Sequence, residues 1–279
     1  MRFNVFYLPI LLLLSFSAWA LPQQLPVPGG VIILPLETGG NVAPEVSYEQ
    51  RQVMVIKQDS QWQAVVGIPL AAKPGNHKVL VDDQGVLSSI VFEVRNKSYP
   101  TQHVNVPDDR KVNPYAEDMV RIEAETARIN KALRNWRVSD DVPFNFVWPV
   151  EGRVSGLFGR RRVFNGEERN PHSGIDIAAP TGTGIMAPAD GVVTDSGDYF
   201  FNGNTVMIDH GQGLVTMFCH LDRIDVKVGQ QVKQRDIIGT VGATGRVTGP
   251  HLHLGVSLND ARVEPLLFFP PRDGYPLLD

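Results

Sequence analysis

The chain of 279 residues has little of three things: cysteine, net positive charge and long apolar runs. Cys219 is the single cysteine, so no disulfide can form within the chain, and stability must come from packing or from a bound metal. The formal net charge is -4, which offers no basic surface of the kind that nucleic acid binds. We therefore expect no nucleic-acid partner.

The most apolar stretch lies at the amino terminus and is too short for a membrane span. Arg2 precedes the run from Val5 to Ser17, and small residues stand directly before Leu21. This order is typical of an export signal, whereas a span needs roughly 20 apolar residues. We expect residues 1–20 to be a removed signal peptide, which leaves no transmembrane segment. No cysteine follows the apolar core, so a lipid anchor is not expected.

Residues 21–110 contain short apolar runs separated by turn residues such as PGN and DDQG. The runs begin at Val31, Val53, Ala64, Lys78 and Ser89. Strands at this spacing predict a small β-sandwich-like domain. His77 and His103 lie alone in this region, and a lone histidine is usually structural, so neither is assigned any chemistry.

Residues 111–140 have the pattern of a linking helix. The segment from Tyr115 to Arg137 contains no glycine or proline and is rich in helix formers. Its apolar residues fall on one face, with Thr126 filling the single gap. They are Met119, Ile122, Ile129, Leu133 and Trp136. A rigid spacer and a helix packed on one domain are both open, and the stripe favours packing.

Residues 141–279 return to short runs punctuated by glycine. These runs begin at Gly191, Asn204, Val226 and Asp236, and no helical pattern lies among them. They predict an antiparallel or barrel-like β domain. The whole chain is therefore expected to be mainly β, with an amino-terminal β-sandwich-like domain, one linking α-helix and a carboxy-terminal antiparallel β domain.

Five of the seven histidines fall in this last region, two of them in GPHLHLGV. Side chains at positions i and i+2 of a strand share a face and lie about 6 to 7 Å apart along it, so His251 and His253 can converge on one ion or reacting centre. Leu252 and Leu254 would then point into the core behind. This pattern favours a functional pair over two surface histidines.

The segment NPHSGIDIAAP supplies further ligand types. His172 and Asp176 are four residues apart, a spacing that places both on one side of either a helix or a strand. With one histidine of the H-x-H pair they form a set of two imidazoles and one carboxylate. Such a set suits a catalytic zinc, because three protein ligands leave the fourth position to water. Iron takes the same ligand count, so the residues alone favour zinc while iron stays open as an alternative.

Three blocks resemble the signature blocks of the LytM/lysostaphin-type (M23) zinc metallopeptidases, which cleave peptidoglycan peptides. The blocks are HSGIDIAAPTGTGIMAPADGVV, MFCHL and GPHLHLGV, within about Trp148 to Pro265. The segments RIEAETARINKAL and GRRRVFNGEERNPHSG further resemble exported bacterial members with an amino-terminal β domain. Residues 141–279 are thereby interpreted as an M23 peptidase domain.

The resemblance implies roles for individual residues. His172, Asp176 and His253 would bind one zinc ion per chain. His220 and His251 would be unligated catalytic histidines, one acting as general base and acid and the other donating to the oxyanion, with the order open. The H-E-x-x-H helix of other metallopeptidases is absent, so no glutamate base is assigned.

Two neighbouring positions carry smaller expectations. Phe218 stands where the family often has a tyrosine, and it keeps the aromatic ring without the hydroxyl. His210, in the turn DHGQG, is expected to hold its hairpin rather than to act in the site.

The function implied is hydrolysis of peptide bonds in peptidoglycan, at cross-links or within the stem peptide, by zinc-activated water. An alternative is a non-catalytic LytM-type module that binds and activates other wall hydrolases, although all five expected positions are filled here. The export signal without a lipid-attachment cysteine is compatible with the periplasm of a Gram-negative bacterium. The amino-terminal domain could block the groove, bind a regulatory protein partner or recognise wall polymer.

Overall fold

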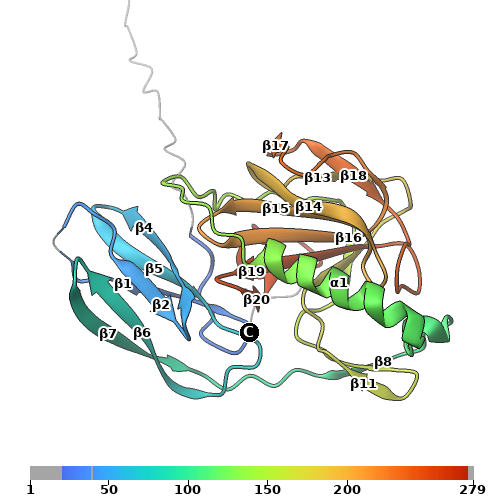
Figure 1. Cartoon of the computed structure of the whole chain (residues 1–279), viewed down its shortest axis with the longest axis horizontal. Coiled ribbons are helices and arrows are strands. Elements are labelled where there is room, and N and C mark those ends of the chain that lie inside the picture. The colour runs from blue at the N-terminus through green and yellow to red at the C-terminus, as the bar shows by residue number, and fades with distance from the viewer. Residues whose placement is uncertain (1–20, 39, 276–279) are drawn as a thin grey trace, which may run out of the picture.

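The computed structural model of the protein describes residues 21–38 and 40–275 and has the mainly β architecture that the sequence predicts (Figure 1). A smaller and a larger β domain lie side by side, and the single α-helix of these residues, α1 (Ala116–Leu133), runs along the larger one. Within the same residues no helix combines the length and apolar character needed to cross a membrane. The predicted signal peptide at residues 1–20 lies outside the described residues.

The smaller domain consists of two antiparallel sheets packed face to face. One has the order β1-β5-β4 and the other β3-β2-β6-β7. Alternation along the strands builds the core, since Val79 and Val81 of β6 are buried while Leu80 between them is exposed. The strands are β1 (Val31–Pro35), β2 (Glu45–Tyr48), β3 (Arg51–Gln52), β4 (Met54–Gln58), β5 (Gln61–Gly67), β6 (Gly75–Asp83) and β7 (Val86–Val94).

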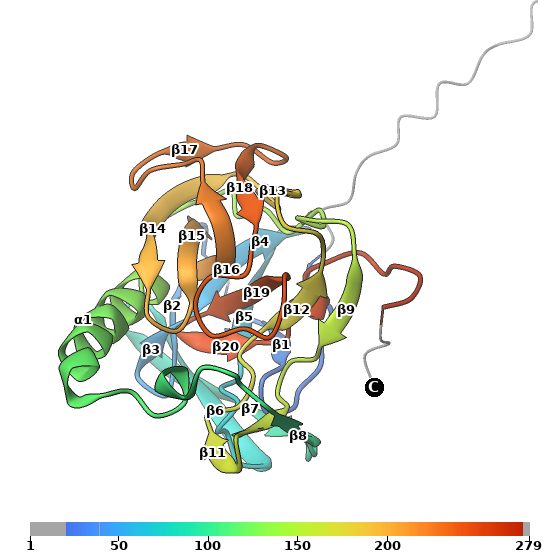
Figure 2. The same cartoon turned by 90° about the vertical axis from the view of Figure 1, so that its right-hand side faces the viewer.

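The larger domain is built on a ten-stranded antiparallel sheet. Its main path is β17-β14-β15-β16-β19-β12-β9, with β13, β18 and β20 attached at its sides. Figure 2 shows β19, β12 and β9 next to one another. The strands are β9 (Arg153–Gly156), β12 (Ile175–Ala178), β13 (Gly184–Met186), β14 (Gly191–Tyr199), β15 (Gly203–Gly211), β16 (Leu214–Ile224), β17 (Gln231–Val232), β18 (Ile237–Val241), β19 (Leu252–Leu258) and β20 (Ala261–Val263).

A small third sheet lies beside the larger domain and has the order β11-β10-β8. Its strands are β8 (Thr101–Val104), β10 (Arg161–Phe164) and β11 (Glu167–Arg169), and β8 runs parallel to β10. A separate apolar cluster, Val104, Val106, Val112 and Phe164, supports it. Strand β8 lies inside the range 21–110 predicted for the first domain, yet it pairs with a strand of the second.

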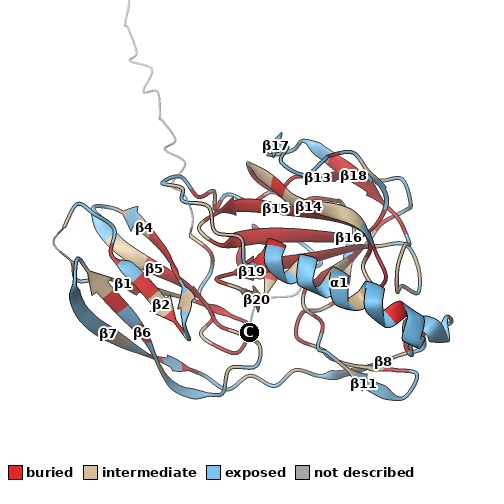
Figure 3. Cartoon of the chain, in the orientation of Figure 1, coloured by how far each residue is buried: buried red, intermediate tan, exposed pale blue. Residues whose placement is uncertain are grey.

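The helix packs on the larger domain through its carboxy-terminal half. Ile129, Ala132 and Leu133 contact Met207 and Met217 of β15 and β16 in one apolar cluster. Figure 3 shows the buried strands under the helix and its exposed outer face. The packed stripe that the sequence predicts is therefore present in this half.

The predicted stripe was too long at both ends. The helix ends at Leu133 rather than at Arg137, and Met119 is 41% exposed. Polar contacts hold the amino-terminal half instead: the Glu125 carboxylate accepts a hydrogen bond from the backbone N–H of Phe200 at 2.7 Å. Met119 therefore lies outside the apolar cluster that holds the other half of the helix.

The two β domains share one hydrophobic core. Val31 and Met54 of the sandwich belong to the same buried cluster as Leu254 and Leu258 of β19. Hydrogen bonds reinforce the joint, because the backbone N–H of Gly67 donates to Asn259 Oδ1 at 2.6 Å and Asn259 Nδ2 donates back to the Gly67 carbonyl at 3.0 Å.

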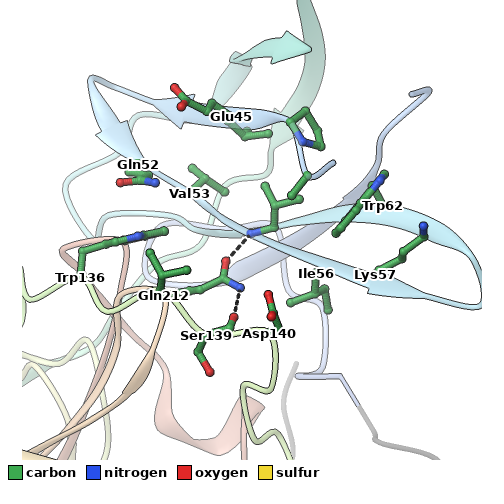
Figure 4. Close-up of a pocket in the computed structure, with 15 residues that line it drawn as sticks. Glu45, Gln52, Val53, Ile56, Lys57, Trp62, Trp136, Ser139, Asp140 and Gln212 are labelled. Carbon is green, nitrogen blue, oxygen red and sulfur yellow. Dashed lines mark hydrogen bonds between the residues drawn. The ribbon is translucent and has the colours of Figure 1, made fainter. Parts of the chain in front are cut away.

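A polar clamp closes the joint at its edge (Figure 4). Gln212 Oε1 accepts from the backbone N–H of Val55 in β4 at 3.0 Å, while Gln212 Nε2 donates to the Ser139 carbonyl at 2.7 Å. One side chain of the larger domain thus links the sandwich to the segment that follows α1.

Candidate active site

Three side chains from different parts of the larger domain meet beside β12. His172 precedes this strand, Asp176 lies on it, and His253 of β19 is the registered partner of Asp176. Asp176 Oδ1 lies 3.0 Å from His172 Nε2 and 2.9 Å from His253 Nδ1, and the two nitrogens are 3.0 Å apart. The structure thus brings together the three residues that the sequence predicts as metal ligands.

The hydrogen-bonding state of His172 is the one expected of a metal-ligating histidine. His172 Nδ1 lies 2.8 Å from the Leu157 carbonyl, so a neutral ring carries its proton there and turns the Nε2 lone pair toward the Asp176 oxygen. Two acceptors facing each other at this distance repel. A bound cation removes the repulsion, and the second-nitrogen hydrogen bond is the usual support for a metal-ligating histidine.

The dimensions and donor types of the triangle fit zinc. Donors at the tetrahedral Zn–N and Zn–O distances of about 2.0–2.1 Å lie about 3.3 Å from one another, close to the observed separations. Two imidazoles and one carboxylate are also among the donor sets that catalytic zinc takes. His172, Asp176 and His253 could therefore hold zinc with a fourth position left for water.

Close backbone approach shapes the triangle. Gly156 of β9 faces Asp176, and a Cβ at this glycine would lie 2.2 Å from Asp176 Oδ2. A Cβ at Gly174 would lie 2.9 Å from His253 Nε2. Arg162 Nη2 donates to Asp176 Oδ2 at 2.9 Å, which leaves Oδ1 directed at the histidines. Glycines and an arginine thus orient the carboxylate.

The H-x-H stretch has the arrangement predicted for it. Leu252 and Leu254 are fully buried on the core side of β19, while His253 faces Asp176. His251 lies just before the strand, where it bridges to Gly242, and its Nε2 is 3.7 Å from Asp176 Oδ1. Both histidines therefore converge on the same carboxylate.

His220 reaches the cluster through an irregularity in β16. The register between β15 and β16 shifts around this residue, and His220 has a left-handed backbone with φ of 67°. A β-bulge of this kind re-aims a side chain, and a strained conformation of this kind is typical of functional sites. The ring centroid of His220 lies 4.9 Å from that of His251 and 6.0 Å from that of His253.

His220 and His251 are held in the same way. His220 Nδ1 lies 2.9 Å from the Thr244 carbonyl, and His251 Nδ1 lies 2.8 Å from the Gly249 carbonyl. In each neutral ring the proton is therefore on Nδ1, and Nε2 is a free proton acceptor. Neither residue belongs to the three-atom triangle, so both remain available for proton transfer.

Burial and mutual repulsion favour the neutral rings. Burial, followed by the neighbouring His253 and His251, lowers the pKa of His220 to about 3. Burial lowers the pKa of His253 to about 4. Burial alone would raise the pKa of Asp176, but its contacts with His172 and His253 outweigh this and hold it well below the usual value. A neutral imidazole and an ionised carboxylate are the protonation states that bind metal.

A cavity of about 160 Å³ adjoins the cluster. Asp176, His220 and His251 line one side, and β8 and β10 form another. Among residues 21–38 and 40–97, none lines the cavity. The sandwich therefore does not cover the site, whereas the segment that leaves it, through β8, forms part of the wall.

Sequence reasoning missed five polar residues that line the cavity: Gln102, Ser155, Arg162, Arg246 and Thr248. A signal for one of them was available, because a run of three arginines, Arg160 to Arg162, stands shortly before the HSGID block. No sequence signal brings Gln102 or Arg246 to the site, because their positions depend on the parallel pairing of β8 and on the path of the loop before β19.

Two other predicted positions lie outside the site. Phe218 is fully buried in the core. His210 is buried with both ring nitrogens occupied, since Nδ1 lies 2.8 Å from the Asp190 carbonyl and Nε2 2.8 Å from Thr216 Oγ1. His210 thus ties β15 to the opposite arm of its hairpin.

Comparison with known families and structures agrees with this site. Residues 170–265 match the family described as Peptidase family M23, and residues 24–97 match the Peptidase family M23 N-terminal domain. A crystal structure from Pseudomonas aeruginosa assigned to peptidase M23 is 43% identical with a TM-score of 0.75, over 88% of this chain and 95% of that one.

Two curated relatives match less than half of this chain. Peptidoglycan DD-endopeptidase ShyC of Vibrio cholerae is 47% identical over 115 residues, which are 40% of this chain and 26% of ShyC. DD-carboxypeptidase/endopeptidase Mpg of Neisseria meningitidis is 42% identical over 123 residues, 44% of this chain and 28% of Mpg. The match thus spans about a quarter of the length of these relatives. Together with the near full-length structural relative, the two matching segments establish that the chain belongs to peptidase family M23.

Proposed function

We propose that the protein is an exported zinc metallopeptidase that hydrolyses peptide bonds in peptidoglycan. The observation that carries this proposal is the triangle of His172, Asp176 and His253 with two further histidines beside it. Two imidazoles and one carboxylate leave a fourth position open for water, and a purely structural metal would not need two neighbouring rings with free nitrogens. The name of ShyC, a peptidoglycan DD-endopeptidase, supports peptidoglycan as the substrate, and the name of Mpg supports an endopeptidase.

The chain's own residues supply positioning and proton transfer. His172, Asp176 and His253 would hold the zinc, which when bound supplies Lewis acidity and lowers the pKa of water from about 15.7 toward 7. Nε2 of one unligated histidine, His220 or His251, accepts the proton of the attacking water and returns it to the leaving amine. The other ring would donate a hydrogen bond to the oxyanion from Nε2, for which it must first take up a proton from solvent, since its Nδ1 proton is held by a backbone carbonyl.

The proposed substrate bond is the cross-link between D-alanine and diaminopimelate or a bond of the stem peptide. The relatives named DD-endopeptidases favour the cross-link. The predicted signal peptide at residues 1–20 and the absence of a following cysteine favour the periplasm of a Gram-negative bacterium. A regulatory partner of the sandwich remains part of this proposal.

A non-catalytic activator of other wall hydrolases is the second candidate. The similarity extends to the cell division protein DipM of Caulobacter vibrioides, 42% identical over 109 residues, whose name states no hydrolytic activity. The complete set of five site residues favours hydrolysis over this alternative.

One experiment separates the two candidates. The chain from Leu21 onward is analysed for metal content and incubated with purified murein, and released peptides are identified by mass. We expect about one zinc per chain, release of cleaved cross-links, and loss of release after treatment with a chelator. A metal-free protein that releases nothing alone but accelerates a second hydrolase would replace the proposed function with the activator role.

A further inference from the structure

We propose that Arg246, with Arg162 beside it, binds a carboxylate of the substrate next to the scissile bond and so determines which cross-links are cut. This inference rests on the proposed function and deepens it. Both arginines line the cavity that also contains Asp176, His220 and His251. A group bound by the arginines is therefore held next to the metal ligands.

The guanidinium of Arg246 is fixed in place by two aromatic rings. Its Cζ lies 4.6 Å from the ring centroid of Phe164 and 4.4 Å from that of Phe201. Arg246 Nη1 donates to the Lys111 carbonyl at 3.3 Å, and the Arg246 backbone N–H donates to the Phe201 carbonyl at 2.8 Å. Stacking of this kind orients the planar fork and leaves donors free for a ligand.

The charge of Arg246 has no counterion among the described residues. The charged groups that act on it are Arg162 and Arg169, and both repel it. Burial and this repulsion lower its pKa to about 10, so the side chain stays positively charged at neutral pH. A partly buried cation without an acidic partner is unfavourable until an anion binds. The electrostatics of this wall therefore favour an anionic ligand.

The same wall contains polar atoms that no protein group satisfies. Arg162 Nε and Gln102 Oε1 are buried without a hydrogen-bond partner. These two residues are registered partners on β10 and β8, and both line the cavity. Arg162 uses Nη2 on Asp176 and keeps Nε unused. Buried polar atoms without a partner are rare in folded proteins, and a ligand bound in the cavity would supply the missing hydrogen bonds.

A carboxylate matches the unused guanidinium donors of Arg246 and Arg162, whereas Gln102 Oε1 is an acceptor that an N–H of the substrate would satisfy. Guanidinium groups bind carboxylates through two parallel hydrogen bonds, and the cavity of about 160 Å³ has room for a small group rather than a peptide stem. In a D-alanine to diaminopimelate cross-link, the carbon that bears the scissile amide nitrogen also carries a carboxylate. In a glycine bridge the corresponding carbon carries an uncharged amide carbonyl in place of a carboxylate. Binding at Arg246 would thus select diaminopimelate cross-links.

The test uses three cross-linked peptide dimers and two readouts. One dimer has all carboxylates free, one is amidated at the diaminopimelate carboxylate beside the scissile bond, and one is amidated at the terminal D-alanine of the acceptor stem. Binding is measured by calorimetry on chelator-treated protein, and kcat/KM is measured on the untreated protein. We expect amidation beside the scissile bond to weaken binding and kcat/KM about 10- to 100-fold, the range of a lost charge-assisted hydrogen bond, and amidation of D-alanine to change little.

Variants assign this effect to Arg246. Arg246→Gln should lower binding and kcat/KM for the unamidated dimer to the values measured for the dimer amidated beside the scissile bond. This variant should therefore bind these two dimers equally. Arg246→Lys, which keeps the charge without the planar fork, should fall between them. Arg161→Gln removes an exposed arginine of the same strand as Arg162 and should retain full selectivity. Thermal unfolding of each variant verifies that it is folded.

The outcomes distinguish the two proposals. Equal binding of all three dimers by the unaltered protein overturns the carboxylate site, even if hydrolysis is efficient. Loss of affinity only on amidation of the terminal D-alanine overturns its assignment to the diaminopimelate carboxylate. Selective binding without any hydrolysis would remove the proposed function and support the carboxylate site alone.

Discussion

The sandwich and the peptidase domain both contain histidines, but the ring nitrogens have different partners. In the sandwich, His77 Nδ1 lies 2.8 Å from Tyr48 Oη and Nε2 lies 2.8 Å from the Lys73 carbonyl, so both nitrogens are used. In the peptidase domain, His172, His220 and His251 each give Nδ1 to a backbone carbonyl and turn Nε2 into the site. The second nitrogen thus faces the candidate site in these three histidines, whereas in His77 it is held by a structural partner.

His210 shows that the distinction holds within one domain. It lies in the peptidase domain, yet both its nitrogens have partners, as those of His77 do. Its ring packs against Phe146, with centroids 5.1 Å apart. Proximity in sequence to His220 therefore does not make His210 part of the site.

The largest expected effect, on zinc content and hydrolysis, comes from comparing one histidine variant in each domain. His172→Ala removes one donor of the triangle, so zinc should be lost and murein hydrolysis should fall by about 10⁴-fold or more, the contribution of several kcal/mol from metal catalysis. His77→Ala, the control, should keep zinc and hydrolysis and lower only the free energy of unfolding, by about 1–3 kcal/mol. Metal analysis and peptide release measure both. Loss of zinc in the His77 variant would break the comparison.

The next effect distinguishes ligands from proton-transfer groups. His220→Ala and His251→Ala each leave the triangle intact, so both should retain zinc while kcat falls about 10²- to 10⁴-fold, the usual contribution of general acid–base catalysis. Zinc content and kcat are measured on the same preparations. A variant that keeps full turnover, or one that loses its metal, contradicts the role given to that residue.

The smallest effect concerns His210 and the pH dependence of stability. Burial, the main cause, and nearby Arg137 lower its pKa to about 4, against the opposing influence of Asp190. Because the unfolded chain then binds a proton near the ordinary value of 6.5 while the folded one does not, the free energy of unfolding should decrease as pH falls from about 6.5 to 4. The loss should reach about 2 kcal/mol at pH 5.

Urea unfolding of the zinc-loaded protein between pH 7.5 and 5 measures this loss. In His210→Gln the titrating group is absent, so the variant should be less stable than the unaltered protein at pH 7.5 and should lose less stability on acidification. Parallel pH profiles for the two proteins would show that His210 does not stay neutral in the fold.

Much of the fold followed from local sequence patterns. Short apolar runs bounded by turn residues predicted strands such as β6 and β14. The H-x-H spacing predicted that His251 and His253 face one centre, since strand geometry has a period of two. Spacing alone grouped His172 and Asp176 with one histidine of the pair, and the choice of His253 came from the resemblance to the M23 family.

The remaining features depend on contacts between distant segments. The helix end at Leu133 and the exposure of Met119 depend on which surface the helix meets, and the amphipathic pattern alone does not contain that information. Arg246 enters the site only because the loop before β19 passes Phe164 of β10. The parallel pairing of β8 with β10 is equally non-local.

That pairing has a consequence for how the chain can be divided. The wall of the cavity begins with Gln102, upstream of the helix, so a fragment starting at residue 141 would lack one side of its own catalytic pocket. The same cut would also uncover the apolar surface of the peptidase half that Val31 and Met54 now shield from water. The wall of the candidate site in this protein is therefore assembled from segments on both sides of the helix, and a carboxy-terminal fragment would present a more open cavity than the whole chain does.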